Sequence, residues 1–174
     1  MNLFLPCTVI LPNFIDNQEM TQKTLNIIAL LCLAAVGFAL VSQHYFDMPP
    51  CAWCVFQRLL FLCIAAICLL GNLFRPLLIK KCLALAGSLT AIGGMLAAWY
   101  QYSVASEMFS CDMTFADRFM SRMTGLDGAI PWLFGIYATC MDARADLLGI
   151  EYALWSLALF AVLLVAFLVA LVKK

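Results

Sequence analysis

Charged residues are scarce in this chain, and their scarcity excludes a soluble domain built around a single core. Only 11% of the 174 residues are Asp, Glu, Lys or Arg, whereas 66% are hydrophobic. Such a composition is typical of a protein that lies in a membrane. The ten basic and ten acidic residues balance to a formal net charge of zero. No polyanionic partner is therefore indicated, and we expect no binding of nucleic acid.

Ligands for metals and nucleotides are equally scarce. His44 is the only histidine, and Cys51 and Cys54 form the only Cys-x-x-Cys pair. Because a zinc knuckle usually needs a second such pair or several histidines, we expect no metal site. The sequence also contains no haem attachment motif and no glycine-rich nucleotide fingerprint.

Long apolar runs are what the chain does contain. Four of them approach the roughly 20 residues that a helix needs to cross the hydrocarbon of a bilayer. They cover about residues 25–43, 54–73, 82–100 and 153–172. We predict an all-α integral membrane protein whose transmembrane domain, residues 25–172, is a four-helix bundle. Small residues four apart in the third run predict close helix packing there: Gly87 and Ala91, then Gly94 and Ala98.

Lysine and arginine beside these runs predict the orientation in the membrane. If four spans alternate, one side receives Lys23, Arg75, Lys80, Lys81, Lys173 and Lys174. Both termini, including a tail of residues 1–24, are therefore expected in the cytoplasm. The loops of about residues 44–53 and 101–152 then face outward. Met20 would serve as a start, so residues 1–19 are either a dispensable extension or a misassigned beginning.

The second outward loop carries an apolar stripe. Its members recur at helical spacing opposite charged residues and are Phe115, Phe119, Met120 and Met123. A segment of this kind favours the surface of a membrane. We predict a short interfacial helix here.

Four of the nine cysteines, Cys51, Cys54, Cys111 and Cys140, belong to the outward side. In an oxidising compartment, an even number of such thiols indicates two disulfides. Two prolines directly before Cys51 favour the start of a helix at that point. Because the N-terminus of a helix carries partial positive charge, we expect a lowered pKa for these thiols.

Arg58 lies about one helical turn into the second span. A charge inside a membrane helix is costly and usually functional. Two explanations stay open at this point: a guanidinium that reaches the surface as an anchor, or a ligand for a polar group beside Cys54.

Two dithiol pairs on one side of a membrane suit a relay of thiol–disulfide exchange, in which a thiolate attacks a disulfide sulfur. Protein side chains offer no net two-electron sink except further cysteines, so a cofactor has to accept the electrons. A lipid-soluble quinone reached from within the bilayer is the simplest acceptor. His44 is a candidate proton relay or an interface anchor, and Gln101 is a candidate quinone ligand.

The joint pattern resembles the DsbB family over about residues 22–172. It consists of the four spans, Cys51-Ala52-Trp53-Cys54 with Gln57-Arg58, and Cys111-Asp112 with Cys140 leading into Arg144-Ala145-Asp146-Leu147-Leu148-Gly149. The resemblance implies an enzyme of the bacterial inner membrane that reoxidises a DsbA-like periplasmic thiol oxidase of the thioredoxin fold. It also implies electron transfer to a quinone, either ubiquinone or menaquinone.

Residue roles follow from the resemblance by position. Cys111 matches the cysteine that forms the mixed disulfide with the soluble oxidase, and Cys140 is its partner. Cys140 would exchange with Cys51, Cys54 would be the thiolate that meets the quinone ring, and Arg58 would bind the quinone. The chain departs from some members in having no histidine near the outward end of the third span.

Two alternatives remain in view. A vitamin K epoxide reductase-like enzyme would use the same chemistry, but that family has its Cys-x-x-Cys deep along a late transmembrane helix. A non-enzymatic membrane protein would use the cysteines for structural disulfides or a zinc site. Structural disulfides would stay oxidised when quinone is depleted, and metal analysis would detect zinc.

Overall fold

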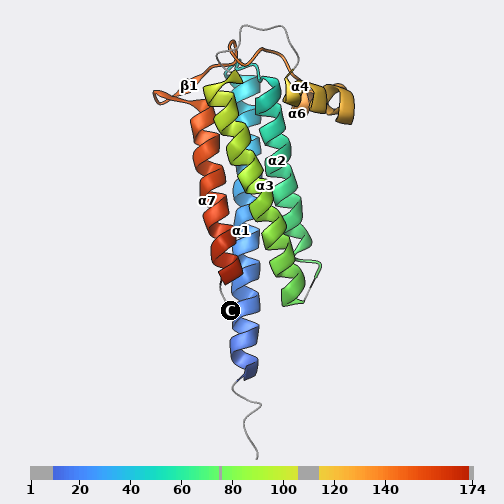
Figure 1. The fold of residues 1–174 in the computed structure, drawn as a ribbon, viewed down its shortest axis with the longest axis vertical. Helices are drawn as coiled ribbons and strands as arrows, with labels where there is room; N and C mark the ends of the chain where they lie inside the picture. Colours follow the sequence, from blue (N-terminus) through green and yellow to red (C-terminus); the bar gives the residue numbers. More distant parts are fainter. Residues whose placement is uncertain (1–9, 75, 106–113, 173–174) are drawn as a thin grey trace, which may run out of the picture.

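Four long helices run side by side and form a bundle (Figure 1). The computed structural model describes residues 10–74, 76–105 and 114–172, with side chains described from residue 21 onward. The long helices are α1 (Ile10–Tyr45), α2 (Ala52–Leu70), α3 (Leu77–Ser103) and α7 (Tyr152–Val172). Each contains a segment long and apolar enough to cross a membrane. The predicted all-α, four-helix membrane fold is confirmed.

Prolines set where two of these helices begin. Cys51, which follows Pro49 and Pro50, has extended backbone angles (φ −86°, ψ 171°) and directly precedes α2. Pro76 precedes α3 in the same way, with φ −60° and ψ 129°. A proline lacks the N–H that a continuing helix needs but is tolerated at the first turn. Cys51 is thereby held at the start of α2, as the sequence predicts.

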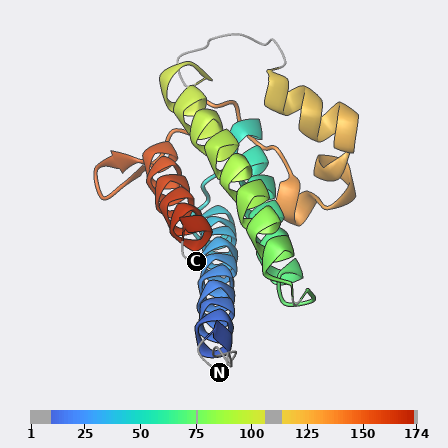
Figure 2. The ribbon, with the colours of Figure 1, turned by 60° about the horizontal axis from the view of Figure 1, so that its bottom comes forward.

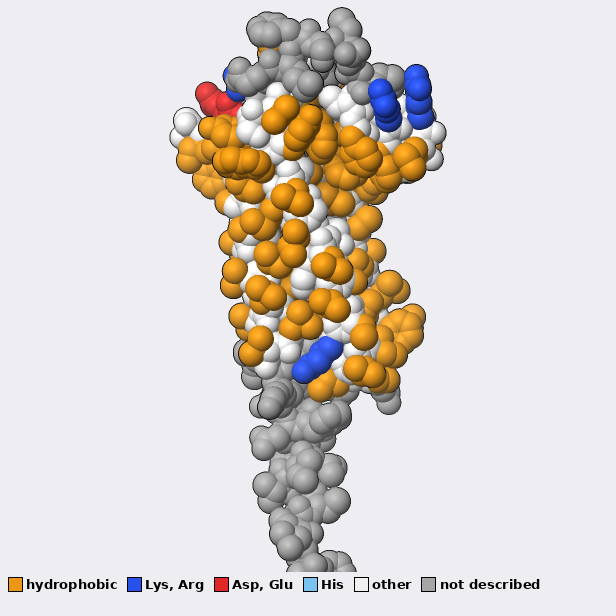
Figure 3. Space-filling view, viewed as in Figure 1, with side chains coloured by type: hydrophobic (Ala, Val, Ile, Leu, Met, Phe, Trp, Pro, Cys, Tyr) orange, Lys and Arg blue, Asp and Glu red, His pale blue; other side chains and the backbone are white. Residues whose placement is uncertain are grey.

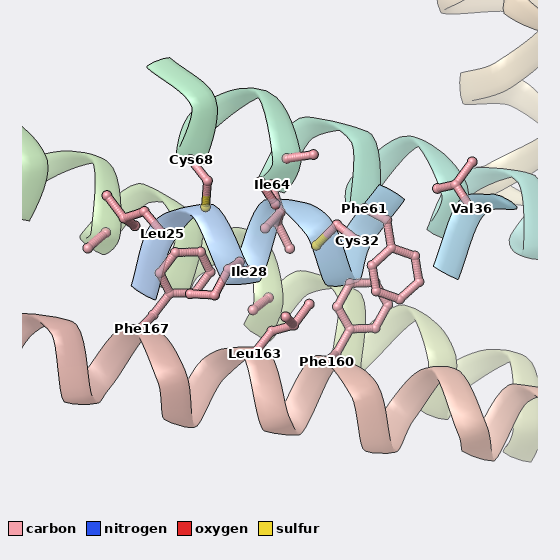
Figure 4. Packing of buried hydrophobic residues seen from close by; sticks show 14 residues of the cluster. Leu25, Ile28, Cys32, Val36, Phe61, Ile64, Cys68, Phe160, Leu163 and Phe167 are labelled. Carbon is pink, nitrogen blue, oxygen red and sulfur yellow. The ribbon is translucent and has the colours of Figure 1, made fainter. Parts of the chain in front are cut away.

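The bundle core lies among all four long helices, where apolar side chains interdigitate (Figure 4). Phe160 and Phe167 of α7 are fully buried in it. A Cβ atom added to Gly94 of α3 would lie 2.3 Å from the ring of Phe160, and one added to Gly87 would lie 2.3 Å from the ring of Phe167. These glycines therefore let α3 approach α7 closely, which confirms the packing predicted from the small residues.

The outer surface of the bundle is apolar along its length. Figure 3 shows hydrophobic side chains covering the flank, with charged side chains near the two ends. Exposed members include Leu78 (74% exposed), Leu96 (67%) and Val165 (60%). Such a surface is stable against lipid tails, whereas a contiguous apolar surface of this kind is rare on soluble monomers.

The second loop forms several short elements at the end of the bundle where α2 begins (Figure 1). They are α4 (Phe115–Asp117), the π-helix η2 (Arg118–Thr124), α5 (Leu126–Ala129), α6 (Pro131–Phe134), β1 (Asp146–Leu147) and β2 (Ile150–Glu151). The short helices and the hairpin β1–β2 lie on different sides of the bundle (Figure 2). Thr114 and Asp117 form a capping box at the start of α4.

Part of the apolar stripe of the second loop is buried in the protein, and part of it is exposed. Met120 is fully buried, and the ring of Phe119 packs edge-on against Phe56 of α2 with centroids 5.5 Å apart. Phe115 and Met123 are 60% and 74% exposed. The segment is thus attached to α2 by part of its stripe, and its position at a membrane interface stays a prediction.

Candidate functional site

The first turn of α2 places two thiols together at one end of the bundle. The Sγ atoms of Cys51 and Cys54 lie 3.1 Å apart, and both residues are free cysteines. Cys51 is completely buried among small side chains, including Ala97 and Ala105, whereas Cys54 is partly exposed. The i, i+3 spacing on a helix accounts for this proximity.

Cys140 reaches the same place from the second loop. It packs against the cluster that contains Cys51, and the two side chains form a hydrogen bond. The main chain holds this part of the loop in position, because the N–H of Tyr137 donates to the carbonyl oxygen of Pro50 at 3.0 Å. Of the four predicted catalytic cysteines, the structure therefore brings three together. Cys111 lies outside the described residues.

Burial and hydrogen bonding make Cys51 a weak acid. Its hydrogen bond with Cys140 and its removal from water raise the pKa of Cys51 to about 12, although its hydrogen bond with Cys54 acts in the opposite direction. The expectation of a lowered pKa at the helix N-terminus is therefore wrong for Cys51. At neutral pH this thiol keeps its proton.

Cys54 instead accepts a hydrogen bond from an amide. Nε2 of Gln101 on α3 donates to Sγ of Cys54 at 3.2 Å. The Oε1 atom of Gln101 accepts in turn from Nε2 of Gln57 at 2.7 Å. Both glutamines are buried, with 7% and 3% of their surface exposed. A continuous chain of hydrogen bonds therefore ends on the sulfur of Cys54.

Arg58 is buried rather than extended to the surface, with 5% of its area exposed. Its Nη1 donates to Oε1 of Gln43 at 2.6 Å and to the carbonyl oxygen of Leu133 at 3.1 Å. Its Nη2 donates to the carbonyl oxygen of Ala39 at 3.3 Å. These three acceptors are neutral, so they satisfy N–H groups without neutralising the charge. The arrangement does not fit a guanidinium that reaches the surface as an anchor.

A cavity of about 520 Å³ opens between α1 and α7 beside these polar groups. Its walls are mainly apolar and include Ala35 and Phe38 of α1 and Leu159 of α7. Phe38 stacks on Tyr152 across the two helices, with centroids 6.4 Å apart. The polar side chains that line it include Cys54, Gln57, Arg58 and Gln101. Its size and mostly apolar lining are those of a site for a small organic molecule.

A family model described as disulfide bond formation protein DsbB matches residues 21–170 of the chain. The chain belongs to the DsbB family. A relative from Herminiimonas arsenicoxydans, "Disulfide bond formation protein B", is 29% identical over 82% of this chain and 90% of its own length. "Disulfide bond formation protein B 2" from Pseudomonas aeruginosa is 32% identical over 76% of this chain and 80% of its own.

Membership in the DsbB family assigns the protein a role in disulfide bond formation at a membrane, as a disulfide oxidoreductase. The site described above contains the groups that such a role requires. Cys51, Cys54 and Cys140 supply sulfur atoms for exchange, and two of them, Cys54 and Cys140, line a cavity suited to a cofactor. Among the described residues, no group of three or more His, Cys, Asp or Glu side chains is arranged to hold a metal ion.

His44 is not part of this DsbB-family site in the structure. Its Nε2 atom lies 3.3 Å from the carbonyl oxygen of Trp132, and the residue is exposed. It lines a separate, smaller hollow together with Asp47 and Tyr137. At this position His44 connects the end of α1 to α6, and its role as an anchor at the membrane interface stays a prediction.

Sequence reasoning missed Gln43 and gave Gln57 no role of its own. Both are amides inside or at the end of apolar spans, where an uncharged polar group is costly unless it is hydrogen-bonded. That cost is a signal that could have identified them. The carbonyl oxygen of Leu133 gives no such signal, because every residue has one.

Proposed function

We propose that the protein is a quinone-dependent thiol oxidase of the bacterial inner membrane, which reoxidises a DsbA-like periplasmic partner. The observation that carries the proposal is the position of Cys54. Its sulfur lies 3.1 Å from that of Cys51, and the residue also lines the apolar cavity with Arg58. Cys54 therefore joins a cluster of exchangeable thiols to a space that a lipid-soluble ring can enter from the bilayer.

The cavity fits the chemistry of a quinone. A quinone has a flat apolar ring, an apolar tail and two carbonyl oxygens that accept hydrogen bonds. Alanine and aromatic side chains of α1 and α7 match the ring and tail, whereas Arg58 and the amide of Gln57 supply donors at the polar end. When bound, the quinone supplies the two-electron acceptor that the cysteines lack.

The cysteines carry the exchange steps. In the proposed relay, a thiolate of the soluble partner attacks Cys111 in a disulfide with Cys140, and Cys140 leaves as a thiolate. Cys140 next attacks Cys51 of a Cys51–Cys54 disulfide, with which it is in contact, and Cys54 leaves as a thiolate. The partner's second thiolate then attacks the partner sulfur bonded to Cys111, which releases the oxidised partner and the Cys111 thiolate. Cys111 attacks Cys140, which restores the Cys111–Cys140 disulfide and releases Cys51. The two electrons and two protons from the partner dithiol then reside on Cys51 and Cys54, from which they would reduce one quinone to a quinol.

The proposed orientation places this chemistry outside the cytoplasm. Basic residues flank the opposite end of the bundle, including Lys23 and Lys81, and cytoplasmic flanks are rich in such residues. Both termini then lie in the cytoplasm, and the cysteine cluster lies in the periplasm. A membrane-impermeant thiol reagent applied to intact spheroplasts should label reduced Cys140 but not Cys82.

One experiment tests the function. The protein is purified in detergent, bound lipid is extracted and identified, and oxidation of a DsbA-like dithiol protein is measured with and without added ubiquinone or menaquinone. We expect partner oxidation only when a quinone is present. If the protein oxidises no dithiol with either quinone, the proposal fails. If the disulfides stay oxidised during quinone depletion, or if the purified protein contains zinc, a structural role replaces it.

A further inference from the structure

We propose that Gln101 is a catalytic residue that stabilises the thiolate of Cys54, and that Gln57 is a positioning residue that fixes the orientation of the Gln101 amide. The part of this inference that concerns turnover rests on the proposed function. The hydrogen bonds themselves concern only the thiols and are independent of any quinone.

The two glutamines come from adjacent helices and meet inside the protein. Gln57 lies on α2, one turn after Cys54, and Gln101 lies near the outward end of α3. Their amides are joined by a 2.7 Å hydrogen bond, and the second hydrogen bond of the chain reaches Sγ of Cys54 at 3.2 Å. Because both side chains are buried, each bond has little competition from water.

The direction of these bonds decides what Gln101 presents to the sulfur. An amide has one acceptor end and one donor end. Gln57 donates to the acceptor end of Gln101, so the donor end of Gln101 faces Cys54. A thiol sulfur is only a weak acceptor, whereas a thiolate is a strong one. A donor held in this position favours the charged form of the sulfur.

The proposed exchange requires the charged form of the Cys54 sulfur at one step. When Cys140 attacks the Cys51–Cys54 disulfide, a bond forms between Cys140 and Cys51, and the bond to Cys54 breaks. Cys54 then leaves with the bonding electron pair and without a proton. Arg58 is directed to other acceptors, namely Gln43, Leu133 and Ala39. The donor that is hydrogen-bonded to the leaving sulfur is therefore the Gln101 amide.

The redox equilibrium of the Cys51–Cys54 pair tests this assignment. A donor that stabilises the reduced pair makes its disulfide more oxidising. The full-length protein without quinone is equilibrated with dithiothreitol buffers of defined potential. The fraction of the pair that is reduced is then measured by alkylation and mass spectrometry. The variants are Gln101→Met and Gln57→Met, which keep the size of the side chain but remove the amide.

We expect Gln101→Met to shift the equilibrium toward the disulfide by about tenfold, which corresponds to about 30 mV for two electrons. Gln57→Met should shift it in the same direction by a smaller factor. Ser88→Ala is the matched control, because Ser88 is also a buried polar residue of α3, and its Oγ donates to the carbonyl oxygen of Ala84 in the same helix. That variant should leave the equilibrium unchanged.

An unchanged equilibrium in Gln101→Met, or an equal shift in Ser88→Ala, overturns the inference. If Gln101→Met does not accumulate in the membrane, Gln57→Met decides the question by the same measurement. Failure of this test leaves the proposed quinone-dependent activity intact, because no quinone takes part in it. Conversely, failure of the quinone assay does not alter the expected thiol equilibrium.

Discussion

Replacing Gly94 with alanine should destabilise the bundle at the contact between α3 and α7. The new Cβ atom would lie 2.3 Å from one atom of the Phe160 ring and 2.5 Å from two others. The ring cannot move away freely, because it is fully buried and stacks on Phe61 with centroids 4.1 Å apart. Adding a methyl group to a well-packed core typically costs about 1–3 kcal/mol.

The neighbouring residue Gly93 supplies a matched control. A Cβ atom added there meets nothing within 4 Å. Both substitutions replace glycine with alanine in the same helix, so the gain in helix propensity, up to about 1 kcal/mol, applies to each and cancels in the comparison. The expected difference between Gly94→Ala and Gly93→Ala is therefore the packing cost alone, about 1–3 kcal/mol.

Unfolding in mixed detergent micelles measures this difference. Each variant is titrated with sodium dodecyl sulfate, and loss of tertiary structure is followed by tryptophan fluorescence. Gly94→Ala should unfold at lower detergent fractions than Gly93→Ala. Combining Gly94→Ala with Phe160→Leu should reduce the penalty, because the smaller side chain makes room for the methyl group. Equal free energies of unfolding for the two alanine variants would refute the close approach of α3 to α7.

Three further predictions concern the thiols and their surroundings. Arg58→Ala, with the four thiols intact, should raise the quinone concentration needed for half-maximal turnover; an unchanged quinone dependence would remove Arg58 from the site. Cys111→Ser should abolish covalent capture of the soluble partner. In Cys140→Ser, the Cys111 thiolate can attack the disulfide of the oxidised partner, and the mixed disulfide should accumulate because no Cys140 thiolate can release it; a non-reducing gel distinguishes the two outcomes. Because its pKa is raised to about 12, reduced Cys51 should be protonated at pH 8, and its alkylation by iodoacetamide should accelerate about tenfold per pH unit toward that value. Cys140→Ala removes the principal cause of the raised pKa and should speed alkylation of Cys51 at pH 8, as site-resolved mass spectrometry would show; no acceleration would contradict the assigned cause.

The bundle could be predicted from the sequence because membrane helices obey simple rules. Apolar length determines a span, and proline determines where a helix can begin, as at Pro76 before α3. Small residues determine close packing, as Gly87 and Gly94 do against α7. Each of these rules depends on residues that are near one another in the chain.

The loop elements could not be predicted in this way. The hairpin β1–β2 turns through Leu148 and Gly149, with φ 58° and 79°, and pairs Leu147 with Ile150. Two-residue turns of this kind normally show Asn-Gly or Asp-Gly, and a leucine in the left-handed region is unusual. The π-helical turn of η2 is equally rare and has no distinctive sequence.

The site residues likewise differ in whether the sequence could predict their positions. The proximity of Cys51 and Cys54 follows from helical spacing, so it could be predicted. The approach of Cys140 depends on a loop whose course is set by contacts such as that between Tyr137 and Pro50. Only the resemblance to a family suggested it. The raised pKa of Cys51 depends on that approach, and the partial charge at the helix N-terminus alone therefore predicts the wrong direction.

The hydrogen bonds of Arg58 connect the parts of the protein on which the proposed reaction depends. One guanidinium links α1 through Gln43 and Ala39, and the second loop through Leu133, to the helix that carries Cys54. Since its acceptors are neutral, the buried positive charge favours negative charge in its surroundings. In the proposed reaction, negative charge develops in the adjacent cavity and on the thiolate of Cys54. Arg58 thus holds the second loop against the bundle, and its charge also favours the negative charge that the proposed reaction generates beside the cavity.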